Sequence, residues 1–299
     1  MKQFLSIISF LIICVCTAQG QAPTADQIRQ RIAQDVYSLK IAPAVVYKID
    51  NRKVWTGEDS IAVRLYYPAP GKQQPIIYQV HGGALVAGNL DTHDNICRLL
   101  ANRTHAIVVA VDYRKPPEAP YPASLNDCAA VLHWIIASAK TWGGDIRNLS
   151  LLGDSGGGLL ITALAIKEQQ ALPVKKMVLI NPAVDLRTPG EGLYGLVTNM
   201  YLQGQSANDS LVSPILAHNF AFFPPTLIIT CEQDILKPHG QALYDKLQQA
   251  GVRTVISDIA GQDHLGSYWS ATHPAAQGAI DKSVAFITGD QKALARPGK

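Results

Sequence analysis

A serine followed by three glycines stands where a strand-like run of the sequence passes into a helix-like run. Ser155 lies in LSLLGDSGGGLLITALAI, and with Gly153 and Gly157 it matches the pattern G-x-S-x-G. Glycine costs roughly 1 kcal/mol relative to alanine inside a helix, so three in succession indicate a turn that needs backbone space. A nucleophilic serine is held on such a strained turn, where flanking side chains would collide with the adjacent strand and helix. We therefore predict Ser155 as a nucleophile and disfavour a phosphate-cradling turn, because the Walker lysine and the G-x-G-x-x-G spacing are missing.

A serine hydroxyl is a weak nucleophile unless a base takes its proton, and an oriented histidine is the usual base. At turns of this kind the partners follow along the chain in the order serine, carboxylate, histidine, on loops after later strands. Asp234 ends the apolar run PPTLIITCEQD, and His264 follows the last such run, VRTVISDIAG. We predict His264 as general base and acid and Asp234 as the carboxylate that orients it. The structural alternative for Asp234 is a charge at a helix N-terminus.

Other carboxylates and histidines in the second half of the chain compete for these roles. Asp258 and Asp263 are rival acids, but they stand so close in sequence to the predicted base that their side chains are expected to point elsewhere. His239 is expected at the start of a helix, and His273 precedes a proline where another helix begins. These positions suit a catalytic base less well than His264.

Backbone amides near the serine are expected to bind the negative charge that develops on a carbonyl oxygen during acyl transfer. The loop VHGGALVAG, at 80–88, follows an apolar run and is similar to the HGGG-type loops of lipases and esterases. We predict an oxyanion hole formed by the N–H groups of Gly83, Ala84 and Gly156. His81 belongs to this loop and precedes the serine, so we assign it a structural role that holds the loop.

The elements that must position these residues alternate along the chain. Apolar, β-branched-rich runs, from PIIYQVHG to VRTVISDIAG, are separated by amphipathic helical segments such as 124–142 and 239–251. Near-continuous apolar strands suit a parallel sheet covered on both faces, so we predict an α/β fold with a mostly parallel central sheet and helices on both faces. Two earlier runs, 45–51 and 60–68, are expected to pair as an antiparallel lead-in.

Two segments depart from this alternation and are candidates for a small cap. Residues 24–39 have the pattern of an isolated amphipathic helix, and residues 187–213 are glycine-rich with scattered aromatic side chains. An ordinary surface connection is the alternative for the second segment. We also hypothesise that residues near the motifs line the mouth of an apolar acyl or alcohol site, namely Leu85, Tyr194, Tyr201 and Trp269.

The composition argues against several classes of partner. The chain has 299 residues, 47% of them hydrophobic, and a formal net charge of +3. This length suits one large domain or two small ones. Because no run of Lys and Arg is present, we expect neither a nucleic-acid partner nor a polybasic membrane patch. The sequence leaves the oligomeric state open, a homodimer included.

The first twenty residues have the layout of a secretory signal peptide. An early positive charge precedes an apolar run at 4–16, and small and polar residues follow as far as Gly20. The run is shorter than the roughly 20 apolar residues that span a bilayer. We predict export to the periplasm or the extracellular space. Lipoprotein anchoring through Cys14 or Cys16 is a disfavoured alternative, because bulky residues precede both.

Three cysteines remain after the predicted cleavage: Cys97, Cys128 and Cys231. They contain no CxxC pair that would suit zinc. We expect buried apolar side chains, with one disulfide as the alternative in an oxidising compartment.

Taken together, the motifs resemble those of the hormone-sensitive-lipase-like (family IV) carboxylesterases of the α/β-hydrolase fold. HGGA is similar to that family's HGGG, GDSGGG to its GDSAGG, and VDYRKPPEAPYPASLNDC to its DYRLAPE segment. EQDILKPHGQALYDKLQQAG and DHLG resemble its later acid and histidine segments, and the likeness runs in order over about 60–289. The resemblance implies Ser155 as nucleophile, His264 as base and Asp234 as acid. It also implies a small-molecule ester as substrate and no metal or organic cofactor.

The sequence departs from the family pattern at three positions. Ala84 replaces a glycine, Gly156 replaces an alanine, and Ile235 stands where proline is frequent. The first two still offer a backbone N–H, and the family's pair of N-terminal cap helices is expected to be reduced to one. We divide the chain into a signal peptide at 1–20, an N-terminal cap helix segment at 21–44, a catalytic domain at 45–290 with a cap or lid insertion at about 187–213, and a C-terminal tail at 291–299.

The sequence therefore predicts a carboxylic ester hydrolase that acts on small to medium acyl esters through a Ser-His-Asp triad and an acyl-enzyme. One alternative is a serine peptidase of the same fold, although such enzymes usually add a large extra domain for which this chain has no room. The other is a non-catalytic binding protein of the hydrolase fold, which would have lost a member of the triad.

Overall fold

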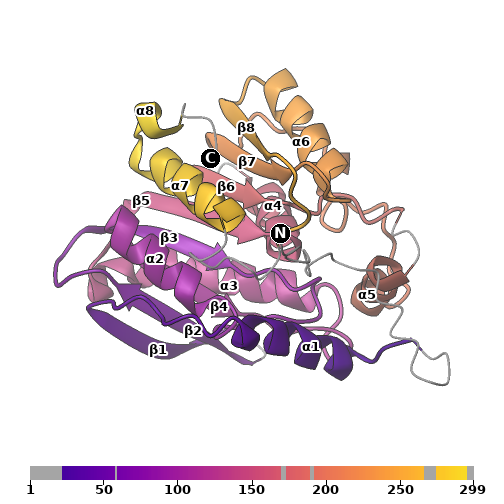
Figure 1. The fold of residues 1–299 in the computed structure, drawn as a ribbon, viewed down its shortest axis with the longest axis horizontal. Helices are drawn as coiled ribbons and strands as arrows, with labels where there is room; N and C mark the ends of the chain where they lie inside the picture. Colours follow the sequence, from indigo (N-terminus) through magenta and orange to yellow (C-terminus); the bar gives the residue numbers. More distant parts are fainter. Residues whose placement is uncertain (1–21, 58, 170–172, 189–191, 266–273, 295–299) are drawn as a thin grey trace, which may run out of the picture.

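The computed structural model of the protein describes residues 22–57, 59–169, 173–188, 192–265 and 274–294, so the predicted signal peptide lies outside the described residues. Within them the apolar runs form an eight-stranded sheet with the order β1-β2-β4-β3-β5-β6-β7-β8 (Figure 1). The strands are β1 (Lys48–Trp55), β2 (Ser60–Tyr67), β3 (Gln74–Val80), β4 (Ile107–Asp112), β5 (Gly144–Asp154), β6 (Val174–Ile180), β7 (Thr226–Cys231) and β8 (Thr254–Ile259).

The sheet is antiparallel at one end and parallel through the rest. β1 pairs with β2, and β2 with β4, in antiparallel register, which confirms the predicted lead-in. Every later pair of neighbours, from β4–β3 to β7–β8, is parallel. β1 begins later than the predicted 45–51 and runs further, because Val45 and Tyr47 are exposed and precede the paired residues. The predicted α/β fold with a mostly parallel sheet is confirmed.

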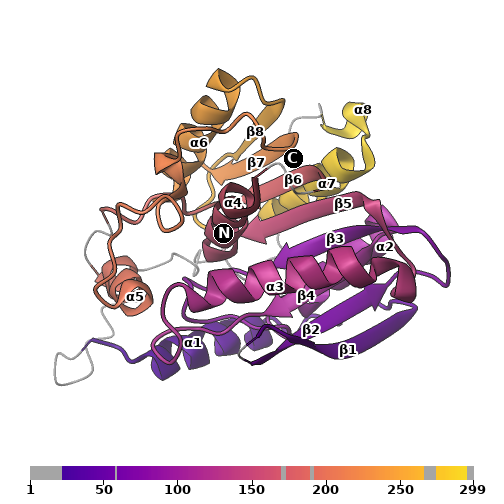
Figure 2. The same cartoon turned by 180° about the vertical axis from the view of Figure 1, so that it is seen from behind.

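Helices cover both faces of the sheet. α3, α4 and α6 pack on one face, and α2 and α7 pack on the other (Figures 1 and 2). Parallel strands require long crossover connections, and α2, α3, α4 and α6 lie in such connections, whereas α7 follows the last strand. The helices are α1 (Ala25–Ser38), α2 (Asp94–Thr104), α3 (Ala123–Ser138), α4 (Gly156–Glu168), α5 (Gly192–Leu202), α6 (Lys237–Gln249), α7 (Pro274–Thr288) and α8 (Gln291–Leu294).

α6 shows how the sequence pattern produces this packing. Leu243 and Leu247 are one helical turn apart and both are fully buried, whereas most of the side chains around them are polar. The chain leaves the helix at Gly251, whose φ of +76° favours glycine. The helix predicted at 239–251 is therefore confirmed.

α1 and α5 lie outside the two helical layers and contact the loop that follows β3. Ile28 of α1 and Val197 of α5 form one buried apolar cluster with Val86 and Ala87 of that loop. α1 begins with a reciprocal hydrogen-bonded cap between Thr24 and the residue three positions later, and it confirms the helix predicted at 24–39. The glycine-rich segment at 187–213 contains α5, so this segment is partly helical.

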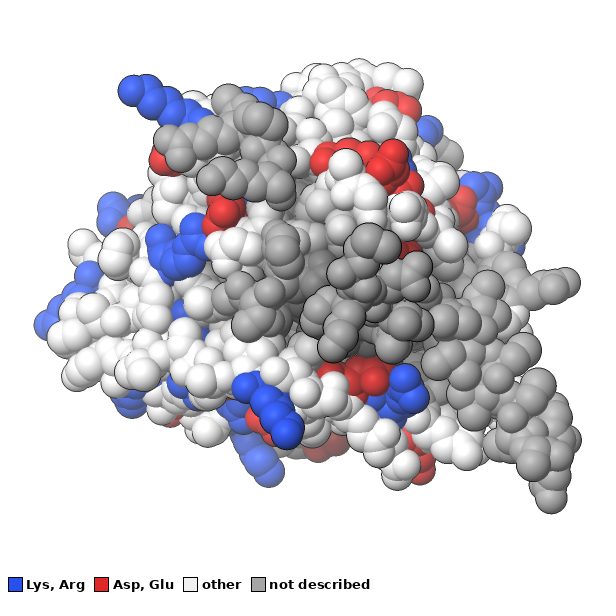
Figure 3. Space-filling view, in the orientation of Figure 1, with Lys and Arg blue, Asp and Glu red and all other residues white. Residues whose placement is uncertain are grey.

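Positive and negative side chains are interspersed on the face of the molecule drawn in Figure 3. Among the residues that the structure describes, no helix is both long and apolar enough to cross a bilayer. Cys97, Cys128 and Cys231 are buried and free. They form no disulfide with one another, and their burial is that of small apolar side chains.

Candidate active site

The turn between β5 and α4 places Ser155 at the carboxyl edge of the sheet. Its backbone has φ 52° and ψ −119°, a conformation that costs energy in a non-glycine residue. The amide of Ser155 donates to the carbonyl of Ile180 over 2.8 Å, and its carbonyl accepts from the amide of Ala183 over 3.2 Å. These contacts with β6 and the residues after it help to hold the strained turn.

The flanking glycines give the turn its space. A Cβ on Gly153 would lie 2.6 Å from the carbonyl oxygen of Gly157, and a Cβ on Gly157 would overlap the carbonyl oxygen of Val80. A Cβ on Gly156 would lie 3.0 Å from the amide nitrogen of Leu85, a contact that requires a small shift. The sequence predicted that this turn needs backbone space, and the structure confirms it at Gly153 and Gly157, where backbone atoms leave no room for a side chain.

Asp234 and His264 are brought together by the loops that follow β7 and β8. Nδ1 of His264 lies 2.8 Å from Oδ2 of Asp234, which also accepts from Nδ2 of Asn181 over 2.5 Å. The other carboxylate oxygen accepts from the amide of Leu236 over 2.9 Å. Burial acts to raise the pKa of the Asp234 carboxyl, but the hydrogen bond and charge of His264, with the two other donors, hold it below its usual range. The carboxylate is thus ionised beside the ring.

The rival residues have other partners. The carboxylate of Asp258 accepts from the hydroxyl of Thr230 over 2.7 Å and pairs with Nζ of Lys237 over 2.6 Å. Asp263 accepts from the backbone amide of His264 over 2.7 Å. His239 lies in the first turn of α6, as expected, where its Nδ1 accepts from a backbone amide. His273 lies outside the described residues.

Ser155 and His264 line one cavity of about 210 Å³. Ser155 is 9% exposed and His264 is 8% exposed, so both predicted catalytic residues are largely shielded from water. The wall combines the start of α4, α5 and the loops after β3, β6, β7 and β8. Its apolar part comes from Ala84, Leu85, Ala183, Leu186, Leu193, Val197, Ile235 and Leu236.

A larger, open hollow of about 590 Å³ lies beside α1 and the loop after β4. Its three cations are ion-paired: Arg29 with Glu118, Arg114 with Asp127, and Lys115 with Asp112. Neither Ser155 nor His264 lines it. Of these two hollows, only the smaller one is lined by the predicted nucleophile and base.

The loop after β3 is strained where it meets the serine. Gly83, Ala84 and Leu85 all have positive φ, of 125°, 54° and 68°, which costs roughly 1–2 kcal/mol at each non-glycine position. Ala84 and Gly156 line the cavity with Ser155, and Gly83 directly precedes Ala84. Among the described residues, none accepts a hydrogen bond from the amides of Gly83, Ala84 or Gly156. Unpaired amides at this place can receive an oxyanion.

Comparisons with known proteins identify the family of the chain. A protein-family model described as the alpha/beta hydrolase fold matches residues 77–266. The chain is 30% identical to carboxylesterase NlhH of Mycobacterium tuberculosis, in an alignment that covers 83% of this chain and 85% of that protein. The chain belongs to the hormone-sensitive-lipase-like carboxylesterases of the α/β-hydrolase fold.

Further relatives support the assignment of this chain to the family. The chain is 27% identical to an arylesterase of Saccharolobus solfataricus, in an alignment that covers 81% of this chain and 84% of that protein. An esterase structure from Pyrobaculum calidifontis superimposes with a TM-score of 0.84 at 29% identity, covering 90% of this chain and 94% of that one. The protein is accordingly a serine carboxylester hydrolase.

Two supporting residues of the carboxylesterase site were missed by the sequence reasoning. Asp154, directly before the serine, accepts from the amide of Gly82 over 3.2 Å and lies 3.3 Å from Nε2 of His93. Asn181 donates to Asp234. The position of Asp154 beside the nucleophile was a signal for its importance, whereas Asn181 follows β6 without any motif.

The predictions for the mouth of the cavity have mixed outcomes. Leu85 and Tyr194 line it, and the Tyr194 hydroxyl is buried with no hydrogen-bond partner among the described residues. Tyr201 was wrongly predicted: it does not line the cavity, because its position in α5 buries it completely in the core. Trp269 lies outside the described residues. His81, predicted to hold the loop, is buried with Nδ1 2.7 Å from the carbonyl oxygen of Gly82.

Proposed function

We propose that this carboxylesterase hydrolyses small acyl esters through Ser155, His264 and Asp234. The observation that carries the proposal is the 2.8 Å hydrogen bond between the Asp234 carboxylate and Nδ1 of His264, a residue that shares a cavity with Ser155. A carboxylate in this position selects the tautomer in which Nε2 accepts a proton, and it stabilises the imidazolium that forms.

The reaction proceeds in two halves. Oγ of Ser155 attacks the ester carbonyl carbon while its proton passes to Nε2 of His264. The bond to the alcohol oxygen then breaks, the alcohol takes the proton from the imidazolium, and the acyl group stays on the serine. Water attacks this acyl-enzyme with His264 again as base, and the carboxylic acid leaves. His264 therefore acts as the base and then as the acid in each half of the reaction.

The negative charge on the carbonyl oxygen is received by the amides of Gly83, Ala84 and Gly156. Their place beside Ser155 and their lack of partners among the described residues support this role. The loss of one such donor typically costs about 10²–10³-fold in kcat. The departure of Ala84 and Gly156 from the family pattern leaves both N–H groups in place.

The size and lining of the cavity favour a short apolar acyl group. Its volume of about 210 Å³ lies below the range of about 300–1,000 Å³ typical of pockets for drug-sized ligands. Leu186, Leu193 and Val197 give it an apolar wall. One relative is named an arylesterase, so phenyl-type esters are suitable probes.

We also propose that the enzyme is exported, on the strength of the signal-peptide layout at 1–20. The contacts of α1 and α5 with the loop after β3 support their role as a small cap on a catalytic domain at 45–290.

Initial rates on p-nitrophenyl esters with two to twelve acyl carbons test the proposal. The wild type is expected to prefer the shorter chains, and Ser155→Ala is expected to lose turnover of all of them. Equal rates for wild type and variant would overturn the role of Ser155. A preference for the longest chains would overturn the substrate class while leaving the chemistry intact.

A further inference from the structure

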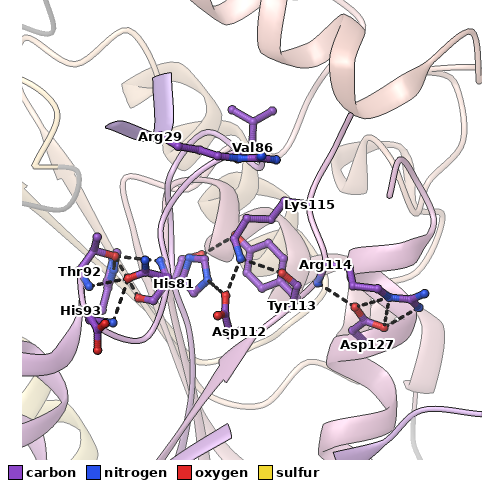
Figure 4. Close-up of polar contacts among 12 residues, drawn as sticks. Arg29, His81, Val86, Thr92, His93, Asp112, Tyr113, Arg114, Lys115 and Asp127 are labelled. Atoms are coloured by element: carbon purple, nitrogen blue, oxygen red, sulfur yellow. Dashed lines mark hydrogen bonds and ion pairs between the residues drawn. The ribbon is translucent and has the colours of Figure 1, made fainter. Parts of the chain in front are cut away.

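Arg29 of α1 connects the cap to the loop that carries two of the proposed oxyanion donors. Its Nε donates to the carbonyl oxygen of Val86 over 2.9 Å (Figure 4). Val86 in turn belongs to the same turn as Gly83, because the amides of Val86 and Ala87 both donate to the Gly83 carbonyl, over 3.2 and 2.8 Å. A side chain of the cap is thus one residue away from the strained segment at 83–85.

The guanidinium is itself fixed by groups outside this loop. Nη2 donates to the carbonyl of Pro116 over 2.8 Å and to Glu118 over 2.6 Å, and Nη1 donates to Glu118 over 2.9 Å. The planar fork of arginine suits this set of acceptors, whereas a lysine ammonium is a point charge that cannot reproduce it. Arg29 therefore joins three segments that are separate in the sequence: α1, the loop after β3 and the loop after β4.

The strained segment needs support of this kind. Positive φ at Ala84 and Leu85 persists only when surrounding contacts over-determine the backbone. On its inner side the loop is held by Asp154, through the Gly82 amide, and by the burial of Val86 and Ala87. On its outer side, Arg29 is the side chain whose charged group reaches the Val86 carbonyl.

We propose that Arg29 is a positioning residue for ester hydrolysis: from the cap it holds the loop after β3 so that the amides of Gly83 and Ala84 face the oxyanion on Ser155. The inference rests on the proposed function, because it acts through the oxyanion hole. It assigns the cap helix a part in the chemical step. A misplacement of about 1 Å at a catalytic group can cost about 10²-fold in rate.

The test compares Arg29→Met, which keeps the apolar stem and removes every donor, with Arg29→Lys and with the control Arg31→Met. Arg31 lies on the same helix, where its exposed side chain forms an ion pair with Asp35. The readouts are kcat and KM on p-nitrophenyl butyrate and the Ki of a trifluoromethyl ketone, whose adduct with the serine places an oxyanion in the same hole. Circular dichroism establishes that each variant is folded at the assay temperature.

Arg29→Met is expected to lower kcat by about 10- to 100-fold with KM within about two-fold, and to raise the Ki by the same factor as kcat falls. Arg29→Lys is expected to lie in between, and Arg31→Met to match the wild type. If Arg29→Met does not fold, Arg29→Lys against Arg31→Met decides. The inference is overturned if the folded Arg29 variants keep the kcat of Arg31→Met, or if only KM changes. If the wild type itself hydrolyses no ester, the proposed function is overturned. This result is distinguishable from failure of the inference, in which the wild type and the Arg29 variants are equally active.

Discussion

Three donors stabilise the charge of Asp234: the ring of His264, the amide of Leu236 and the side chain of Asn181. Because its pKa is held below the usual range of a carboxyl, the ionised form contributes stability at all pH values above that range. This contribution is lost as pH falls through the lowered pKa. At neutral pH the carboxylate is thus fixed as an acceptor for the imidazole N–H.

Asp234→Asn is expected to lower kcat by about 10³–10⁴-fold, because an amide favours the wrong tautomer of His264. KM should change little, since the side chain does not line the cavity. Asp258→Asn is the matched control, because that carboxylate pairs with Lys237 away from the catalytic ring. Steady-state kinetics of the two variants measures the effect, and a similar loss in both would contradict the assignment.

The meeting of Ser155, Asp234 and His264 at one site was predictable because a motif and a fixed chain order point to these three residues. The residues that hold these side chains and the neighbouring loop in place could not be predicted from the sequence. Arg29 meets Val86 across 57 positions of sequence, and Asn181 meets Asp234 across 53. Neither pairing has a spacing rule, since each depends on how loops from different strands converge at one edge of the sheet.

The elbow between β5 and α4 depends on the absence of a side chain at Gly157. Gly157→Ala is expected to destabilise the protein by about 1–3 kcal/mol or to prevent folding, because the methyl group overlaps backbone atoms of Val80 and His81 that cannot move independently. Gly278→Ala, in α7, meets nothing within 4 Å and should stabilise by about 0.5–1 kcal/mol. Urea unfolding gives both values. Equal effects in the two variants would show that the elbow has more space than the contacts indicate.

The stability that the Arg29–Glu118 ion pair gives to the packing of α1 is expected to fall in acid. The hydrogen bond from Arg29 lowers the pKa of Glu118 from 4.5 to about 2. A lowered pKa gives stability that is complete above pH 4.5 and lost as pH falls toward 2. The stability difference between wild type and Glu118→Gln should therefore be constant above that window and shrink within it. Urea titrations at several pH values measure it, and a difference independent of pH would contradict the pairing.

Elements were predictable where periodicity was strong and less so elsewhere. α6 and the pairing of β1 with β2 followed from apolar patterns. α5 was missed as a helix because its segment is rich in glycine, and it is fixed instead by the apolar contact of Val197 with α1 and the loop after β3. Tertiary packing overrides propensity at this place.

The alternation of apolar strands and helices along the chain predicted the layers of the fold, because a parallel sheet must be covered on both faces. The sequence did not predict that β4 lies between β2 and β3, since strand order depends on which crossover each helix makes. The carboxyl edge of that sheet nevertheless gathers every predicted catalytic side chain, as the general rule for open α/β sheets requires.

Export is a prediction about the whole chain. The protein produced in a secreting host should lack its first residues, with a new N-terminus near Gly20, and should be found outside the cytoplasm. Mass spectrometry of the intact protein from the cell fractions measures both. A lipid-modified N-terminus at Cys14 or Cys16 would establish anchoring instead, and an intact first residue in the cytoplasm would contradict export.

Active-site labelling with a fluorophosphonate, followed by peptide mapping, tests the nucleophilic role of Ser155 most directly. The proposed mechanism predicts one label per chain, on Ser155, with esterase activity lost in proportion to labelling and no label on Ser155→Ala. Esterase activity that persists when Ser155 is fully labelled, or that disappears on labelling of another residue, would contradict it.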